Sequence, residues 1–283
     1  MSAAPDGGDR DRAVVGVIAG AGDLPRLIAE DRRARGLRYL ICAFQGAAPP
    51  WIGDHPHAVV RHEKPGALFA ALRGAGVDTV AFAGAMARPQ LHPLAFDLTA
   101  LRLAPRILPM LRQGDDALLR GLAGVLEAEG FRLVGAHELL SGLLAPPGDC
   151  AARKADAEDR ADIARAAALV AGLGALDVGQ AAVVAGGVCL GLESIQGTDA
   201  LLAFAGATPQ RLRPRPGVLY KAPKPGQDWR VDLPAIGPQT LRAASAAGLA
   251  GVAVRAGGVL VLGLEATRAE ADRLRLFLHG WPE

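Results

Sequence analysis

The first half of the chain alternates short apolar runs with longer amphipathic segments, and this rhythm is the strongest constraint on its fold. Such apolar runs are typical of buried strands, and the amphipathic segments between them are typical of helices that cover a parallel sheet. Helices are predicted over residues 24–36 and 65–76, ending at Gly36 and near Gly74. Strands are predicted over residues 13–20, 38–44, 57–62, 78–84 and 131–136. A Rossmann-like parallel sheet is therefore expected.

The second half of the chain has a different pattern. Residues 180–194 read as two strands joined by Gly186 and Gly187, which is the signal of a β-hairpin. Residues 251–265 repeat the design around a second pair of glycines, so a second hairpin is predicted there. Glycine-turn hairpins are common, which favours chance similarity between the two segments, and a weak internal repeat is the alternative.

A turn-rich segment separates the two patterns. Residues 145–158 are rich in proline, glycine and charge, and they are interpreted as a linker. The chain is thus expected to be α/β, with a Rossmann-like N-terminal domain over residues 13–144. A C-terminal mixed-sheet α/β domain is expected over residues 159–283 and carries a charged loop.

Composition excludes several classes of protein. With 283 residues, 51% of them hydrophobic, the chain can bury two cores. A formal net charge of +2 gives no long-range field that would favour nucleic acid as a partner. The three cysteines lack C-x-x-C spacing, and the polar N-terminus does not resemble a signal peptide, so a cytoplasmic protein is expected.

Two glycine turns follow predicted strands in the first half. The stretch "IAGAGDLP" places Gly20, Ala21 and Gly22 between a strand and a helix start, where backbone amides often bind phosphate. The dinucleotide fingerprint fails, because Pro25 stands where its third glycine belongs. Gly84 ends a later strand with a similar turn. These residues are candidate contacts for a phosphate or nucleotide, and a tight structural turn is the alternative.

The stretch "LESIQGTDALL" contains a second group of polar candidates. Thr198 or Asp199 is expected to cap the helix that follows the turn. A cap does not explain Glu193, since an acid at the end of a buried strand needs a donor nearby. Lys221, at the end of a later apolar run, is the predicted donor.

Fixed charge is concentrated on the stretch "KAPKPGQDWRVDLPAIGPQT", residues 221–240. Its prolines favour a stiff loop over a helix or a central strand. Lys221 and Lys224 suit phosphate, Arg230 can fork to two phosphate oxygens, and Asp228 or Asp232 can bind a divalent metal or position water. In an extended segment Arg230 and Asp232 would project to the same side. The alternative is a solvated loop with chance ion pairs.

These stretches, together with "GALDVGQAAVV" and "GDDALLR", resemble the LpxI family of UDP-2,3-diacylglucosamine pyrophosphatases over residues 14–280. The resemblance implies a two-domain enzyme of lipid A biosynthesis that uses magnesium to release UMP and lipid X, the diacylglucosamine 1-phosphate. It implies attack of water on the alpha phosphorus. The segment after "LESIQGTDALL" departs from the family, because no basic residue directly follows that helix start.

The resemblance also implies roles for individual residues. The essential carboxylate is expected in the R-x-D-L-P element, which makes Asp232 the first choice over Asp228. Lys221, Lys224 and Arg230 complete the expected catalytic set, and Asp199 joins Asp232 as an expected Mg²⁺ ligand. Asp115 and Asp116 are interpreted from the sequence as a cap at a helix start, and a site for a divalent cation is the alternative. The expected contacts with substrate are Gly20, Ala21, Gly22, Gly84, Glu193, Thr198, Asp199 and Gln227.

A diacylated substrate requires an apolar cleft. Residues 91–113 are a candidate wall of that cleft or a membrane-facing helix, and an ordinary core helix is the alternative. Peripheral contact with the inner membrane surface and a homodimer are further hypotheses. The rival functions are another nucleotide-sugar phosphohydrolase and a non-catalytic nucleotide-binding regulator.

Overall fold

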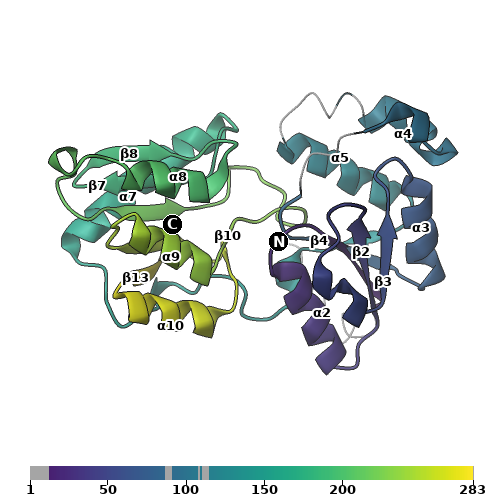
Figure 1. Ribbon diagram of the computed structural model, residues 1–283, viewed down its shortest axis with the longest axis horizontal. Helices are drawn as coiled ribbons and strands as arrows, with labels where there is room; N and C mark the ends of the chain where they lie inside the picture. The colour runs from purple at the N-terminus through teal and green to yellow at the C-terminus, as the bar shows by residue number, and fades with distance from the viewer. Residues whose placement is uncertain (1–12, 87–90, 108, 110–114, 283) are drawn as a thin grey trace. The chain divides into compact units, whose positions relative to one another are not determined.

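The fold comes from a computed structural model that describes residues 13–86, 91–107, 109 and 115–282 (Figure 1). The chain divides into two compact units. Unit 1 comprises the residues up to Ser141 together with Asp228–Asp232, and unit 2 comprises Gly142–Gln227 together with Leu233–Glu283. The α/β class and the two kinds of sheet expected from the sequence are confirmed, and each unit is described by itself below.

Unit 1 contains a five-stranded parallel sheet. All five predicted strands are present, and their order in the sheet is β3-β2-β1-β4-β5. The chain therefore winds outward from β1 in one direction and then returns to β4 on its other side, which creates a switch point between these two strands. The strands are β1 (Val15–Ala19), β2 (Tyr39–Phe44), β3 (His57–Val60), β4 (Thr79–Ala83) and β5 (Arg132–Leu133).

The helices of unit 1 connect these strands. Helix α2 is followed by Arg35 and helix α3 by Ala75. The next residue in each case is a glycine with positive φ, Gly36 or Gly76. The expectation of a cap near Gly74 is therefore off by two residues, because α3 continues through Gly74 itself. The helices are α2 (Leu24–Ala34), α3 (Pro65–Gly74), α4 (Leu98–Ile107), α5 (Asp115–Ala128) and α6 (Ala136–Leu139), with short 3-10 turns η1 (Pro50–Asp54) and η2 (Pro93–Ala95).

Unit 2 is built around a six-stranded mixed sheet in the order β6-β13-β11-β9-β7-β8. The three strands β13, β11 and β9 are parallel, whereas β6, β7 and β8 pair antiparallel with their neighbours. The strands are β6 (Gly148–Asp149), β7 (Ala181–Ala185), β8 (Val188–Leu192), β9 (Val218–Lys221), β11 (Gly251–Arg255) and β13 (Phe277–Trp281). A separate parallel pair is formed by β10 (Ala235–Ile236) and β12 (Leu260–Val261).

Helices cover both faces of this sheet. Alternate residues of each strand point to opposite faces, so Val183, Leu219 and Val252 pack with α8, α9 and α10, while Val184 and Val218 pack with α7. The helices are α7 (Ala157–Ala175), α8 (Gly197–Gly206), α9 (Pro238–Ala246) and α10 (Leu264–Leu274), with a short 3-10 turn η4 (Gln210–Leu212).

One predicted hairpin is present and the other is not. Gly186 and Gly187 both have positive φ and join β7 to β8, as the sequence predicts. The predicted hairpin at residues 251–265 is wrong, and the internal repeat falls with it. Because β11 is bonded on both sides by β9 and β13, it has no free edge, and β12 pairs with β10 instead.

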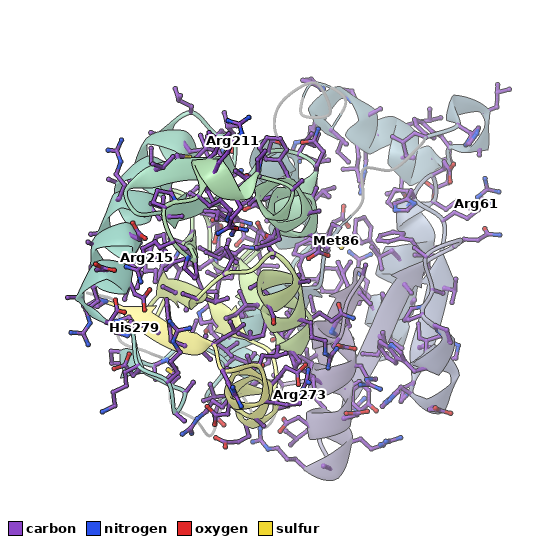
Figure 2. All side chains as sticks on the ribbon, turned by 60° about the vertical axis from the view of Figure 1, so that its left-hand side comes forward. Arg61, Met86, Arg211, Arg215, Arg273 and His279 are labelled. Carbon is purple, nitrogen blue, oxygen red and sulfur yellow. The ribbon has the colours of Figure 1, made fainter. Side chains whose placement is uncertain are left out.

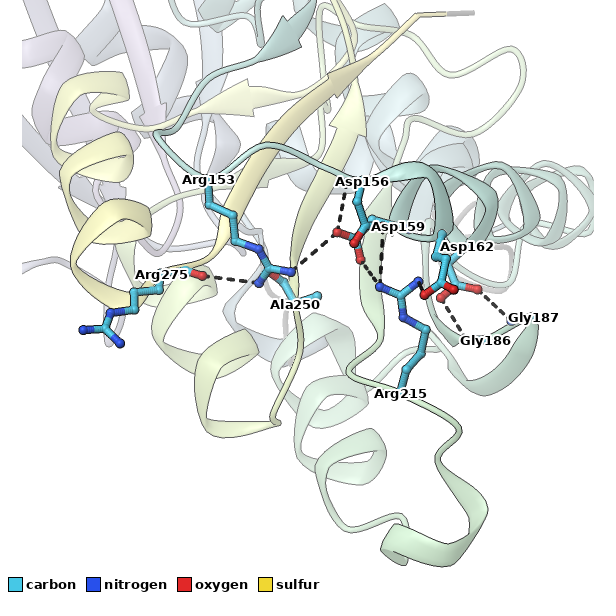
Figure 3. A network of polar contacts seen from close by, with 10 residues as sticks. Arg153, Asp156, Asp159, Asp162, Gly186, Gly187, Arg215, Ala250 and Arg275 are labelled. Atoms are coloured by element: carbon cyan, nitrogen blue, oxygen red, sulfur yellow. Dashed lines mark hydrogen bonds and ion pairs between the residues drawn. The ribbon is translucent and has the colours of Figure 1, made fainter.

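The segment interpreted as a linker is packed into unit 2. Within it, β6 pairs with β13, and Asp156 caps α7 by accepting a hydrogen bond from the amide of Asp159. The carboxylate of Asp159 is fully buried between Arg215 and Arg153, with nitrogen–oxygen distances of 2.8 and 3.5 Å (Figure 3). Residues 145–158 are thus held by strand pairing and buried ion pairs.

None of the helices in the described part of the chain combines the length and the hydropathy needed to cross a membrane.

Candidate active site

The charged loop begins at the carboxyl end of β9 and ends where β10 starts. Ligands commonly bind at the carboxyl ends of parallel strands, and β9 lies beside the parallel strand β11. The loop is shared between the two units, because residues 228–232 belong to unit 1 and the residues on either side belong to unit 2. The candidate catalytic residues therefore come from both units.

In unit 2, Lys221 and Glu193 are joined through a threonine. The Lys221 ammonium donates to Thr198 Oγ1 at 2.8 Å, and this hydroxyl donates to Glu193 Oε1 at 3.1 Å. Lys221 also donates to the carbonyl of Ala235 at 3.4 Å. Lys221 and Glu193 are both buried. The sequence predicted that Lys221 and Glu193 lie close together, and they do. Their connection, however, passes through the hydroxyl of Thr198.

The second carboxylate oxygen of Glu193, Oε2, is buried, and no donor among the described residues reaches it. A buried carboxylate oxygen without a hydrogen bond is costly. The carboxylate of Glu193 is therefore held mainly by the hydrogen bond that Thr198 donates to its other oxygen, Oε1.

The start of α8 differs from the expected cap. The helix begins at Gly197, and the preceding Gln196 makes no side-chain cap. Thr198 turns toward Lys221 instead, because Gly197, with φ of 83°, redirects the backbone just before it. Asp199 is exposed in the first turn of α8, where a negative charge interacts favourably with the helix dipole.

Lys224 and Gln227 shape the loop itself. Gln227 is buried, and its side-chain oxygen accepts from the backbone amide of Lys224 at 2.9 Å. The ammonium of Lys224 pairs with Asp177 at 2.6 Å. Lys224 keeps access to solvent, so an anionic ligand can compete with Asp177 for it. Asp177 was not singled out by the sequence, and its positive φ of 54° is a feature that sequence patterns do not reveal.

In unit 1, Arg230 is engaged by two carboxylates. Its guanidinium donates to both oxygens of Asp228, at 3.0 and 2.8 Å, and to Glu127 at 2.8 Å. These hydrogen bonds hold the pKa of Asp228 below its usual value and raise the pKa of Arg230. The expected fork from Arg230 to phosphate is therefore made to carboxylates in this structure.

The Asp228–Asp232 segment is a turn and not extended, so alternation along a strand does not place Arg230 and Asp232 on one side. The amides of Val231 and Asp232 both bond to the carbonyl of Asp228, at 3.0 and 3.2 Å. Val231 is buried in the apolar core of unit 1 and anchors the turn. Asp232 follows this anchor and is half-buried. Arg230 faces Asp228 and Glu127, so its position does not depend on alternation with Asp232.

The glycine turns of unit 1 lie at the switch point between β1 and β4 and pack against each other. Ala21 and Ala85 exchange backbone hydrogen bonds of 2.8 and 2.9 Å. A Cβ atom on Gly20 would lie 2.4 Å from the Ala85 carbonyl oxygen, and one on Gly84 would lie 2.3 Å from that of Ala21. Close backbone packing thus accounts for these two glycines. Gly22, with φ of 95°, faces open space.

Unit 1 also contains an apolar cavity of about 170 Å³. The carboxyl ends of the sheet strands contribute Ile18, Phe44 and Phe82, and Arg61 and His62 are polar residues at its wall. The ring of His62 stacks on Phe44, with 3.9 Å between centroids, and burial lowers its pKa. Helices α4 and α5 supply much of the other apolar lining with Ala100, Leu103, Ala104, Ile107, Leu118, Leu119, Leu122, Val125 and Leu126, and α3 contributes Pro65, Leu68 and Phe69.

Residues 91–113 were predicted to be a cleft wall, a membrane-facing helix or a core helix. The described part of this segment lines the cavity, which fits the first of these. The α5 lining was missed, although its apolar residues recur at helical spacing, which is a signal that sequence can supply.

No three acidic, histidine or cysteine side chains gather to form a metal site among the residues that the structure describes. Asp199 lies in unit 2 and Asp232 in unit 1. The side chains of Asp115 and Asp116 lie outside the described residues. A single carboxylate at Asp232 still fits Mg²⁺, which is commonly held by one or two carboxylates, water and substrate phosphates.

Comparison with known proteins identifies the family. A model of the LpxI N-terminal domain matches residues 14–143, and a model of the LpxI C-terminal domain matches residues 146–279. The chain is 41% identical over 270 residues to the UDP-2,3-diacylglucosamine pyrophosphatase LpxI of Caulobacter vibrioides, covering 94% of this chain and 96% of that protein. The resemblance predicted from the motifs is confirmed, and the chain belongs to the LpxI family.

Proposed function

We propose that this protein hydrolyses UDP-2,3-diacylglucosamine to UMP and 2,3-diacylglucosamine 1-phosphate in lipid A biosynthesis. The observation that carries the proposal is the match to a named pyrophosphatase along nearly the whole of both chains. Water attacks the alpha phosphorus, and the diacylglucosamine 1-phosphate leaves. Another nucleotide-sugar phosphohydrolase and a non-catalytic nucleotide-binding regulator are the rival functions.

Cationic side chains on the loop are suited to the pyrophosphate. Hydrolysis of a pyrophosphate diester requires charge neutralisation on two phosphoryl groups and an oriented water. Lys221 is held in place by Thr198 and Ala235, and Lys224 is braced through its backbone by Gln227. Such preorganisation means that little reordering is needed when the phosphates bind.

Asp232 is the proposed catalytic carboxylate, with the task of orienting water or holding the metal. Asp228, the other carboxylate of the turn, is already engaged by Arg230. Mg²⁺ is the proposed cofactor, with Asp232 as a ligand and Asp199 as a second candidate. Bound there, Mg²⁺ would neutralise charge on the phosphates. Arg230 acts in this scheme by fixing the turn that presents Asp232.

The acyl chains are assigned to the apolar cavity of unit 1. Its wall is almost entirely apolar, and it opens among the strand ends where ligands of this class of sheet bind. An acyl chain gains free energy from each methylene group that leaves water. The Gly22 turn, at the carboxyl end of β1, is the proposed contact for the polar part of the substrate.

A substrate of this kind resides in a membrane, so we also propose a cytoplasmic protein that contacts the inner membrane surface peripherally. A homodimer stays a prediction, and sedimentation of the purified protein at several concentrations would test it.

Hydrolysis in ¹⁸O-labelled water tests the reaction. The label is expected in UMP, and the reaction is expected to stop when EDTA removes divalent cations and to resume with Mg²⁺. Label found only in diacylglucosamine 1-phosphate would move the attack to the other phosphorus. Absence of turnover, with UDP-2,3-diacylglucosamine still bound, would favour the regulator.

A further inference from the structure

The outer face of α4 exposes a row of leucines. Leu94, Leu98 and Leu101 are 105%, 85% and 55% exposed. Among the described residues of unit 1, Val59 is the one other large hydrophobic side chain that is strongly exposed. The three leucines are spaced four and three residues apart, which places the two on α4 on one face and the third just before its start.

The inner face of the same helix is also apolar. Ala100, Leu103, Ala104 and Ile107 line the cavity that is assigned to an acyl chain. Helix α4 is therefore apolar on both faces and lies beside α3 and α5 (Figure 1). A helix that is apolar on both faces needs an apolar environment on both sides, but the structure supplies one on the inner side alone.

Basic side chains border the exposed leucines. Exposed cations stand on α4, at the start of α3 and at the cavity wall, and Arg61 extends away from the ribbon (Figure 2). They are Arg61, Lys64, Arg102 and Arg106.

The neighbouring acids are largely buried and pair with two of these cations. Glu63, with a side chain 7% exposed, pairs with Arg61 at 3.3 Å, and Glu129, 16% exposed, pairs with Arg102. Asp97 bonds to the amides of Gly66 and Ala100. The four cations outnumber these three acids, so the leucines keep a positive border, which matches a surface of anionic lipid.

We propose that the outer face of α4 docks on an anionic lipid bilayer, with Leu94, Leu98 and Leu101 inserted among the acyl chains. The role of the inner face rests on the proposed function. With one face in the bilayer and the other on the cavity, α4 separates the membrane from the acyl-chain site by a single helix. An acyl chain then moves from bilayer to cavity along α4 without crossing water.

Sedimentation with vesicles, in the absence of substrate, tests the docking. The probe is vesicles of phosphatidylcholine with about one quarter phosphatidylglycerol. Leu98→Glu/Leu101→Glu is expected to weaken binding by roughly a hundredfold, because two leucine side chains lose their burial in lipid. Leu212→Glu is the matched control, since Leu212 is a similarly exposed leucine of unit 2, at 51%. It should bind like wild type.

Circular dichroism and the melting temperature establish that the double variant is folded. Wild-type binding should also weaken on vesicles of phosphatidylcholine alone and in high salt. Equal vesicle binding by the double variant and wild type would overturn the proposal, as would an equal loss in the control. If the double variant bound vesicles like wild type but differed from it in oligomeric state, the leucine face would belong to an interface with a second copy of the chain.

A second measurement separates this inference from the proposed function. The double variant should hydrolyse detergent-dispersed UDP-2,3-diacylglucosamine at close to the wild-type rate, yet hydrolyse vesicle-embedded substrate at least about tenfold more slowly. If neither protein hydrolyses anything, the proposed function fails while the vesicle result still decides the docking face. Equal slowing with both forms of substrate would contradict a route along α4.

Discussion

Arg230 grips Asp228 with two parallel hydrogen bonds, from Nε to Oδ1 at 3.0 Å and from Nη2 to Oδ2 at 2.8 Å. Two-pronged pairs of this kind combine charge with fixed geometry. The pair lies within the turn that leads to Asp232, the proposed catalytic carboxylate. Asp228 therefore shapes the turn, and this structural role is distinct from the role proposed for Asp232.

Asp232→Asn should lower kcat by roughly a hundredfold or more, the usual scale for loss of a catalytic group. Substrate affinity should change little, because the neutral amide keeps the shape of the carboxylate. Turnover and equilibrium binding of UDP-2,3-diacylglucosamine measure the two effects. Asp228→Asn is the matched control, and it should keep appreciable activity. A dead Asp228→Asn beside an active Asp232→Asn would reverse the assignment.

The Asp228–Arg230 pair should make folding stability depend on pH. Arg230 holds the pKa of Asp228 below its ordinary value of 3.8, so the folded state binds fewer protons there than the unfolded state. The stabilisation is present above the ordinary pKa and is lost as the pH falls through the lowered one. Urea unfolding across this range should show the gap between wild type and Asp228→Asn closing toward acid. A gap that is independent of pH would contradict the pairing.

Thr198→Val should destabilise unit 2 by about 1–3 kcal/mol, because buried Lys221 loses an acceptor and Glu193 loses its donor. It should also lower kcat, since Lys221 is no longer directed. Thr198→Ser keeps the hydroxyl and should restore most of both properties. Urea unfolding and steady-state kinetics provide the comparison. Equal behaviour of the valine and serine variants would show that the hydroxyl is irrelevant.

Ala104→Phe should obstruct the apolar cavity, because this side chain lines it from α4. KM for the diacylated substrate is expected to rise, and substrates with shorter acyl chains should be affected less. Ala128→Phe, on the exposed surface of α5, serves as the control and should leave kinetics unchanged. If Ala104→Phe raised KM equally for every chain length, the cavity would not be the acyl-chain site.

Gly84→Ala should be strongly destabilising, since φ is 86° and the added Cβ would lie 2.3 Å from the Ala21 carbonyl oxygen. Gly124→Ala, inside α5 with open space around it, should be neutral or stabilising by up to about 1 kcal/mol. Thermal unfolding of both variants tests the claim. A Gly84→Ala protein as stable as wild type would contradict the close packing of the two turns.

Much of the fold could be predicted from local signals in the sequence. The five strands of unit 1 were visible as apolar runs, and the hairpin at Gly186 and Gly187 was visible because a two-residue glycine turn needs no distant partner. The family could be recognised from spaced motifs such as the charged loop, and the loop itself from its prolines. These features depend on residues that are near one another in the chain.

The tertiary structure decided which of these features meet. Arg230 pairs with Glu127, Lys224 with Asp177, and the Glu193 carboxylate reaches Lys221 through Thr198. The second predicted hairpin failed because β11 has partners on both sides. Local sequence sets the hydrophobic period and the backbone conformation of a segment. The partner of a charged side chain or of a strand edge is a group distant in the chain, and packing of the core decides which group comes within a few ångströms. That choice is made by the folded chain as a whole.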